Sequence, residues 1–343
     1  MRVKGMGIMY ATREDVKNAL DAKETARNNA QIDRAIEGAS RAVERICHRM
    51  FYPTTDTRYF DWPDDRSSRS WRLWLDEDEL LSVTSITSGG TTIAATDYFL
   101  YPANSSPKDH VEIDLSSAAD FETGDTHQRN IVITGVFGYT TDTEASTTLA
   151  EALDATETGV DIAASTTVGV GSIIKVDSEW MTVTGRALLT TGTTLTADVA
   201  SSVAVVTIPV SSGTGYLAGE VVQVDSEKLL VVDVAGNNLT VKRAWDGSAL
   251  ASHLSGATVY APRTLTVVRG ALGSTAATHL TEAPVSILAV PALIRTYVIA
   301  RSVAQIAREV GGYTSDASKA SAGLNDLRME VETLYGRLRM GAM

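Results

Sequence analysis

The middle of the chain contains two kinds of internal repeat, and their order is the feature that most restricts the fold. The segment GSIIKVDSE at 171–179 is repeated as GEVVQVDSE at 219–227, and LTVKRAWDGS at 239–248 is repeated as LTVVRGALGS at 265–274. We call the first kind of repeat the front half of a module and the second kind its back half. Along the chain, two front halves therefore precede two back halves. Tandem modules would alternate front and back halves, so this order predicts that one small β module is nested inside another.

The nested arrangement assigns approximate limits to each module. The inner module would span 192–262, and the outer module would combine 145–191 with 263–285. The strand in Gly171–Val183 and the strand in Leu265–Arg269 would then lie in the same sheet. This region is rich in Thr, Val, Gly and Ala and has almost no helical periodicity, which indicates an all-β structure.

Each front half carries two carboxylates that are two residues apart, Asp177 with Glu179 and Asp225 with Glu227. Glycosidases and calcium sites use carboxylates that converge in this way. No third acid and no aromatic platform recurs with the pair, so we interpret each pair as part of a polar hairpin turn. His253 and His279 follow the two back halves without a second His at ligand spacing, which favours a structural contact.

Other motifs of catalysis and ligand binding are missing from the sequence. It has no Ser–His–Asp order, no phosphate-binding glycine loop and no dinucleotide fingerprint. Cys47 is the single cysteine, so neither an internal disulfide nor a thiolate zinc cluster is expected. The acidic run Asp76–Glu79 is interpreted as solvated turn residues. We therefore predict no enzyme activity, no catalytic residues, no cofactor and no metal site.

The two ends of the chain are predicted to be helical. Thr12 is a plausible N-cap for a short helix that reaches Leu20, and a longer amphipathic helix follows from about Asn28 to Met50. Near the C-terminus, Pro291–Val310 is expected to form a helix buried on more than one face. A final helix carries an apolar stripe, covered either by its own domain or by another protein. The stripe consists of Leu324, Leu327, Val331, Leu334 and Leu338.

The long N-terminal helix carries four arginines on its polar side. Arg34, Arg41, Arg45 and Arg49 could line a nucleic-acid surface, but glutamates lie between them, so a solvated face is the preferred interpretation.

Residues 51–139 change to a period of two and predict a small sheet. Ser88-Gly89-Gly90 is expected to form a hairpin turn, and Thr92–Tyr101 is expected to form one of the strands. Three tryptophans, Trp62, Trp71 and Trp74, are expected to cap the sheet.

Charge restricts the class of protein further. The chain has 30 Lys and Arg against 42 Asp and Glu, a formal charge of −12, which excludes a surface that grips nucleic acid throughout. The acids concentrate in 61–285, whereas both helical ends are slightly positive. Residues 1–10 lack a signal peptide, and the apolar stretch 284–307 is interrupted by Pro291 and two arginines. We therefore expect a soluble protein that has no membrane partner.

The order of these elements resembles the head–tail connector (adaptor) proteins of tailed bacteriophages. In that family the TGVFGY strand is followed closely by a long helix, whereas here about 145 additional residues intervene. The resemblance covers 1–140 and 286–343. It is carried by the two N-terminal helices and by the segments RMFYPTTDTRYFDWP, LWLDEDELLSVTSIT, TDYFLYP and NIVITGVFGY.

Pattern and resemblance together predict an α+β fold with a helical connector core, a small β-sheet and a large inserted all-β region of repeated modules. The expected domains are a connector core at 1–142, inserted β modules at 143–285, and C-terminal connector helices at 286–343. The inserted modules look like small β modules that decorate phage structural proteins.

The resemblance implies a structural virion protein. It would form a ring, usually of twelve copies, under the portal protein, and would be located in the virion neck after assembly in the host cytoplasm. It would extend the channel for DNA packaging and ejection without binding double-stranded DNA tightly, and would carry tail or stopper proteins. The implied portal-binding residues are Leu327, Val331, Leu334, Tyr335, Arg337, Leu338, Arg339 and Met340.

Two other classes stay open. The protein could be a capsid decoration or tail structural protein in which the β modules make the functional contact. Less favoured is a carbohydrate-binding or hydrolytic β protein that uses the repeated Asp-Ser-Glu segments.

Overall fold

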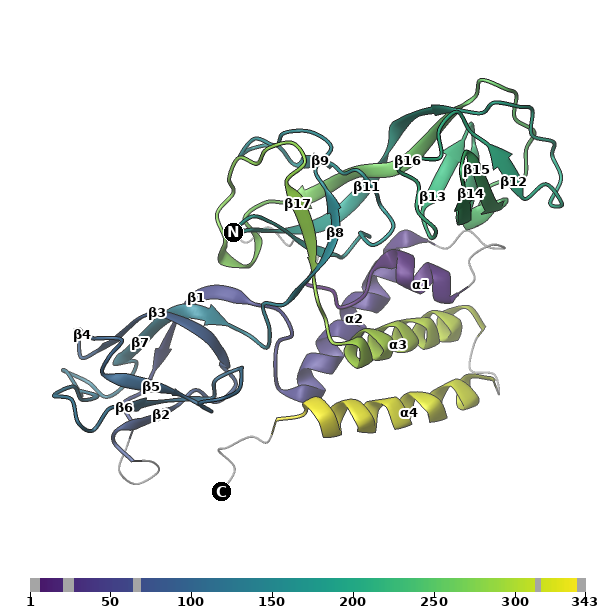
Figure 1. The fold of residues 1–343 in the computed structure, drawn as a ribbon. Helices are drawn as coiled ribbons and strands as arrows, with labels where there is room; N and C mark the ends of the chain where they lie inside the picture. Colours follow the sequence, from purple (N-terminus) through teal and green to yellow (C-terminus); the bar gives the residue numbers. More distant parts are fainter. Residues whose placement is uncertain (1–6, 21–27, 64–68, 312–315, 338–343) are drawn as a thin grey trace.

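The computed structural model describes residues 7–20, 28–63, 69–311 and 316–337 (Figure 1). Helices from both ends of the chain form one body. A β domain and two β modules lie beside this body. Strands contain 37% of the residues and helices contain 21%. The strands form three antiparallel sheets.

The prediction of an α+β fold built on a helical connector core is therefore wrong, because the protein is mostly β. One cause lies within the expected strand Thr92–Tyr101. The amide of Asp97 donates to the carbonyl of Ala94 over 2.9 Å, and this turn ends one strand before the next begins in a different sheet. The region expected to be a small sheet thus becomes a domain of two sheets.

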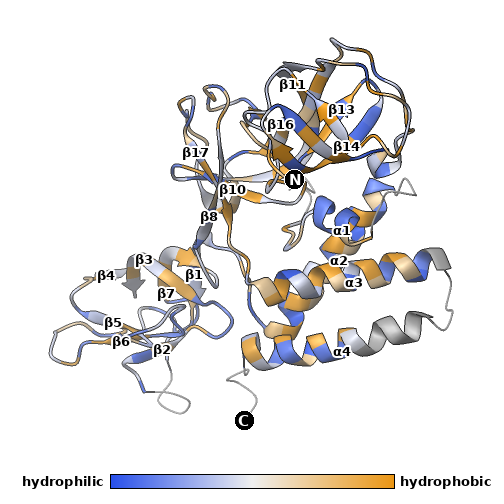
Figure 2. Cartoon of the chain, turned by 45° about the vertical axis from the view of Figure 1, so that its right-hand side comes forward, coloured by the Kyte–Doolittle hydropathy of each residue, from blue (hydrophilic) through white to orange (hydrophobic). Residues whose placement is uncertain are grey.

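The helical body consists of four α-helices. Thr12 caps the first helix through a capping box with Asp15, and the Asn28 side chain accepts from the amide of Ala30 at the start of the second. In Figure 2 hydrophobic and hydrophilic residues alternate along α2 and α3, as expected of helices that bury one face. The helices are α1 (Arg13–Ala19), α2 (Asn29–Cys47), α3 (Ala292–Gly311) and α4 (Asp316–Tyr335).

The β domain contains two antiparallel sheets that share one hydrophobic core. The first sheet has the order β1-β7-β3-β4 and the second has the order β2-β6-β5. Phe60 and Ile133 of the first sheet enter the same core as Leu73 and Val111 of the second. The strands are β1 (Thr54–Phe60), β2 (Arg72–Trp74), β3 (Leu80–Ser88), β4 (Thr91–Ile93), β5 (Tyr98–Tyr101), β6 (His110–Ile113) and β7 (Ile131–Phe137).

The turn predicted at Ser88-Gly89-Gly90 joins β3 to β4. Gly89 and Gly90 have φ values of 58° and 86°, a region that glycine adopts without steric cost. Ser88 pairs with Thr91 across the hairpin.

The third sheet has ten strands and contains both β modules. Its order is β12-β15-β14-β13-β16-β11-β10-β17-β8, with β9 paired to β16. The strands are β8 (Thr143–Thr148), β9 (Gly159–Asp161), β10 (Ile173–Val176), β11 (Glu179–Thr194), β12 (Thr207–Pro209), β13 (Val221–Val224), β14 (Glu227–Ala235), β15 (Asn238–Lys242), β16 (Thr258–Val268) and β17 (Pro284–Leu288).

Two long strands, β11 and β16, run through both modules. They pair from Thr182 with Val268 in the outer module to Thr194 with Thr258 in the inner module. The front half at 171–179 therefore shares a sheet with the back half at 265–274, as the repeat order predicts. Each module also has its own hydrophobic core, one around Val183 and Leu265 and the other around Val231 and Val241.

A buried ion pair fixes the junction between the modules. Arg263 on β16 donates from Nε and Nη2 to the two carboxylate oxygens of Glu220, each over 2.8 Å. Glu220 also accepts from the amide and the hydroxyl of Ser165, which belongs to the outer module. Glu220 is 1% exposed, so this carboxylate ties the two modules together away from solvent.

Candidate functional site

The structure places the predicted partner-binding stripe of α4 partly against the protein's own helices. Val331 is fully buried in the core of the helical body, and Leu327 and Tyr335 pack against that core. Leu334 points outward and is 63% exposed. Leu338, Arg339 and Met340 lie outside the described residues. The chain's own helices thus cover most of the apolar stripe, while Leu334 stays accessible.

The end of α4 is held at the junction of the helical body and the β domain. The Tyr335 ring meets the rings of Phe51 and Tyr139 edge-on, with centroid distances of 5.8 and 6.0 Å. The Arg337 amide donates to the carbonyl of Cys47 over 3.1 Å. Tyr335 and Arg337 are therefore part of an internal contact.

A buried carboxylate lies at the same junction. Glu79 is 5% exposed and forms an ion pair with Arg49 at 3.1 Å, while its Oε2 has no hydrogen-bond partner. Burial raises the pKa of Glu79, although Arg49 and Arg337 act in the opposite direction. This acid of the predicted turn run is therefore not solvated.

The two repeated glutamates form nearly identical buried clusters. Glu179 accepts five hydrogen bonds at 2.8–3.0 Å: two from Arg269, two from the amides of Gly270 and Ala277, and one from His279. In the inner module, Glu227 accepts the same five bonds at 2.7–3.0 Å. Its donors are Arg243, the amides of Ala244 and Ala251, and His253.

These bonds determine the charge of both glutamates. Burial alone would raise the pKa of each carboxyl group, but the hydrogen bonds from arginine, histidine and backbone amides outweigh it and lower the pKa to about 2. Each glutamate is thus held as an anion with its acceptor sites occupied. This arrangement suits a structural role and leaves no proton for general acid catalysis.

Each repeated histidine lies between two carboxylates. His279 Nδ1 is 2.7 Å from Asp177 Oδ2 and its Nε2 is 3.0 Å from Glu179 Oε2. His253 makes the same pair of contacts at 2.8 and 3.0 Å with Asp225 and Glu227. Each ring therefore bridges an exposed aspartate side chain and a fully buried glutamate side chain of its own module.

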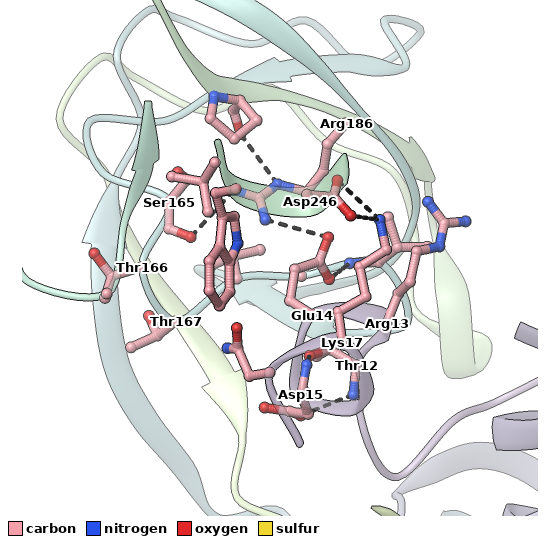
Figure 3. Close-up of a pocket in the computed structure, with 18 of the residues that line it drawn as sticks. Thr12, Arg13, Glu14, Asp15, Lys17, Ser165, Thr166, Thr167, Arg186 and Asp246 are labelled. Atoms are coloured by element: carbon pink, nitrogen blue, oxygen red, sulfur yellow. Dashed lines mark hydrogen bonds and ion pairs between the residues drawn. The ribbon is translucent and has the colours of Figure 1, made fainter. Parts of the chain in front are cut away.

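A cavity of about 340 Å³ lies where α1 meets the two modules (Figure 3). Figure 3 shows Glu14, Lys17, Arg186 and Asp246 pointing toward one another around it. Lys17 Nζ is 2.9 Å from Asp246 of the inner module, and Arg186 Nη1 is 3.3 Å from Glu14. These labelled charges are all paired, so the cavity wall joins α1 to the modules and leaves none of the four free to hold a ligand.

Asp246 is the anion that holds α1 to the inner module. Burial would raise its pKa, but hydrogen bonds from Lys228 and Lys17 outweigh it and lower the pKa. Asp246 lies in the short 3₁₀ turn η1 (Trp245–Gly247). The equivalent turn of the outer module, η2 (Ala271–Gly273), contacts β1, so both modules use the same corner to meet the rest of the protein.

The remaining predicted residues have structural partners. Asp78 pairs with Arg58, and Trp62 and Trp71 pack on the core of the β domain. Cys47 is buried and unpaired, and burial raises the pKa of its thiol to about 11. Among the described residues no group of three or more His, Cys, Asp or Glu side chains is arranged to hold a metal ion.

The sequence analysis did not identify Arg243 and Arg269, which each donate two hydrogen bonds to the buried glutamate of their module. The signal was present, because the two back halves have an arginine at the same position, between the Leu-Thr-Val segment and the Gly-Ser pair. A carboxylate repeated in the front half and a cation repeated in the back half indicate a buried pair once the modules are known to be nested.

Comparison with known proteins adds no assignment. No family model, no curated protein and no solved structure matches the chain. In the described part of the chain, every helix is too short or too polar to span a bilayer.

Proposed function

We propose that this protein is a structural component of a tailed-bacteriophage neck, a connector ring subunit that binds the portal and carries tail or stopper proteins. One observation supports the proposal most directly. Met9 and Ile32 from the N-terminal part share one core with Tyr297 and Val331 from the C-terminal part, although the β modules lie between them in sequence. The modules are thus an insertion between two parts of the chain that share one core, and this supports the proposal.

The outer face of α4 offers a contact surface for a partner. Met329 is 67% exposed and Leu334 is 63% exposed, on a helix whose other face is buried. A helix can dock onto a partner protein through the apolar side chains that its own domain leaves uncovered. We assign this face to the portal contact.

Negative-stain microscopy of the protein, alone and with its portal, tests the proposal. We expect rings on the portal, and we expect M329D/L334D to lose them while the matched module variant V203D/V232D keeps them. Val203 and Val232 are 65% and 47% exposed in the inner module, so the control makes the same chemical change away from α4. A wild-type protein that never binds the portal would refute the proposal.

A second function, capsid decoration by the modules, is favoured by one observation. Leu254 and Leu280 directly follow the two repeated histidines and are 73% and 80% exposed. They have equivalent positions in the two modules. If L254D/L280D abolishes attachment to capsids while M329D/L334D does not, decoration replaces the connector assignment.

A further inference from the structure

Three arginines, one from each of three helices, line one hollow on the helical body. Arg45 comes from α2, Arg301 from α3 and Arg328 from α4, and the hollow has a volume of about 420 Å³. His48 at the end of α2 also lines it, and Glu332 is the one carboxylate among the described residues of its wall. Figure 1 shows these three helices, α2, α3 and α4, side by side.

These arginines have no anionic partner within the described part of the chain. Arg45 and Arg328 make none of the ion pairs found among the described residues, and both side chains are exposed. Arg301 donates to the hydroxyl of Tyr297 over 3.0 Å, and that tyrosine is fully buried. By contrast, Arg13, Arg58, Arg243, Arg263 and Arg269 all pair with carboxylates.

The local helix does not account for this clustering. The negative end of the α2 dipole favours a cation at Arg45, in the last turn of that helix. The dipole does not explain Arg301 or Arg328, which lie within α3 and α4. Three arginines with a single carboxylate, Glu332, in the described wall of one hollow give a local excess of positive charge in a protein of net charge −12, which favours an anionic partner.

We propose that this hollow binds an acidic segment of a protein partner, through carboxylate side chains paired with Arg45, Arg301 and Arg328. Guanidinium groups bind carboxylates with two parallel hydrogen bonds, so three of them hold a short acidic segment in one orientation. This proposal rests on the proposed function and adds to it the chemistry of a partner. The hollow lies beside the α4 face that we assign to the portal contact.

The surroundings favour an acidic segment over nucleic acid. A second hollow of about 540 Å³ shares Arg45 and His48 and is lined by Glu44, Glu77 and Asp78. Duplex DNA carries one charge per about 1.7 Å, so it would bring many phosphates against these acids and against the acidic β domain. A short acidic peptide brings far fewer negative charges near these acids than a duplex does.

Fluorescence anisotropy with a labelled hexaglutamate peptide tests the proposal on the full chain at low salt. We expect saturable binding that weakens as salt rises, and R45Q/R328Q should weaken it by about tenfold or more. The matched control is R34Q/R308Q, which removes two exposed arginines of α2 and α3 outside the hollow. It should change the affinity by less than about twofold.

Three results would overturn the proposal: no binding by the wild type, equal losses in both double variants, or tighter binding of a short DNA duplex than of hexaglutamate. Circular dichroism of each variant confirms that it is folded. The assay uses no virion component, so its failure is distinct from failure of the portal experiment.

Discussion

Glu179 and His279 lie 100 residues apart in the chain, yet Glu179 Oε2 is 3.0 Å from His279 Nε2. Glu227 and His253 make the same contact in the inner module. Because β11 and β16 bring the two halves of each module together, one arrangement of carboxylate, arginine and histidine is built twice. The stability of the modules should therefore depend on these clusters.

Removal of one charge from a cluster should destabilise its module. In R243M the Glu227 carboxylate loses two hydrogen bonds and is left buried, which costs about 3–5 kcal/mol of unfolding free energy. Urea denaturation followed by tryptophan fluorescence, to which Trp245 of the inner module contributes, measures the loss. E151Q, which alters an exposed carboxylate of the outer module, is the control and should change stability by less than about 0.5 kcal/mol. An unchanged midpoint in R243M would contradict the structural role of the cluster.

The same clusters should make the modules sensitive to acid. The folded pKa of Glu179 and Glu227 is about 2, below the ordinary value of 4.5, so each contributes its full stability above pH 4.5. That contribution, on the order of 3 kcal/mol per glutamate, is lost as the pH falls from 4.5 toward 2. Urea denaturation at a series of pH values should show this decline, and E227Q should show a shallower one. A stability that stays constant over this range would contradict the prediction.

The ion pair between Lys17 and Asp246 should hold α1 to the inner module. K17M removes this pair but leaves the pair between Lys228 and Asp246, so global stability should fall by about 1 kcal/mol or less. Hydrogen exchange of the amides in Arg13–Ala19 should become faster. K228M keeps the pair with Lys17 and should leave these amides protected. Equal exchange in the wild type and K17M would contradict this role.

Gly273 should be needed where the outer module meets β1. Its φ is 79°, and a Cβ atom there would lie 2.1 Å from the backbone oxygen of Thr55. Gly256 has a φ of 89°, and a Cβ atom added to it would have no neighbour within 4 Å, so G256A carries the backbone strain alone, about 1–2 kcal/mol. G273A should lose clearly more thermal stability than G256A. Equal melting temperatures for the two variants would contradict the contact.

Parts of this fold could be predicted from local sequence. The Thr12 cap and the turn at Ser88-Gly89-Gly90 depend on neighbouring residues, and the nested order follows from self-similarity. The overall class could not be predicted in this way. The turn at Ala94–Asp97 moves the chain from one sheet to another, and a period of two persists on both sides of it.

The candidate sites, like the fold, could be predicted from the sequence only in part. The repeated carboxylates are visible in the sequence, but whether Glu179 is solvated or buried depends on Arg269, which is 90 residues away. The arginines of the hollow are also scattered along the chain. The sequence around Arg45 indicates only a polar helix face, because Arg301 and Arg328 come from the other end of the chain.

The pairing of Thr194 with Thr258 places the entry and the exit of the inner module side by side. Facing residues of antiparallel strands lie about 5 Å apart, a gap that a two-residue turn can close. Shortening the chain at this point would leave a continuous hairpin, and a different small domain with adjacent ends could replace the inner module there. The inner module thus enters and leaves the sheet at one point, and a domain grafted there would have to replace Glu220 as the partner of Arg263.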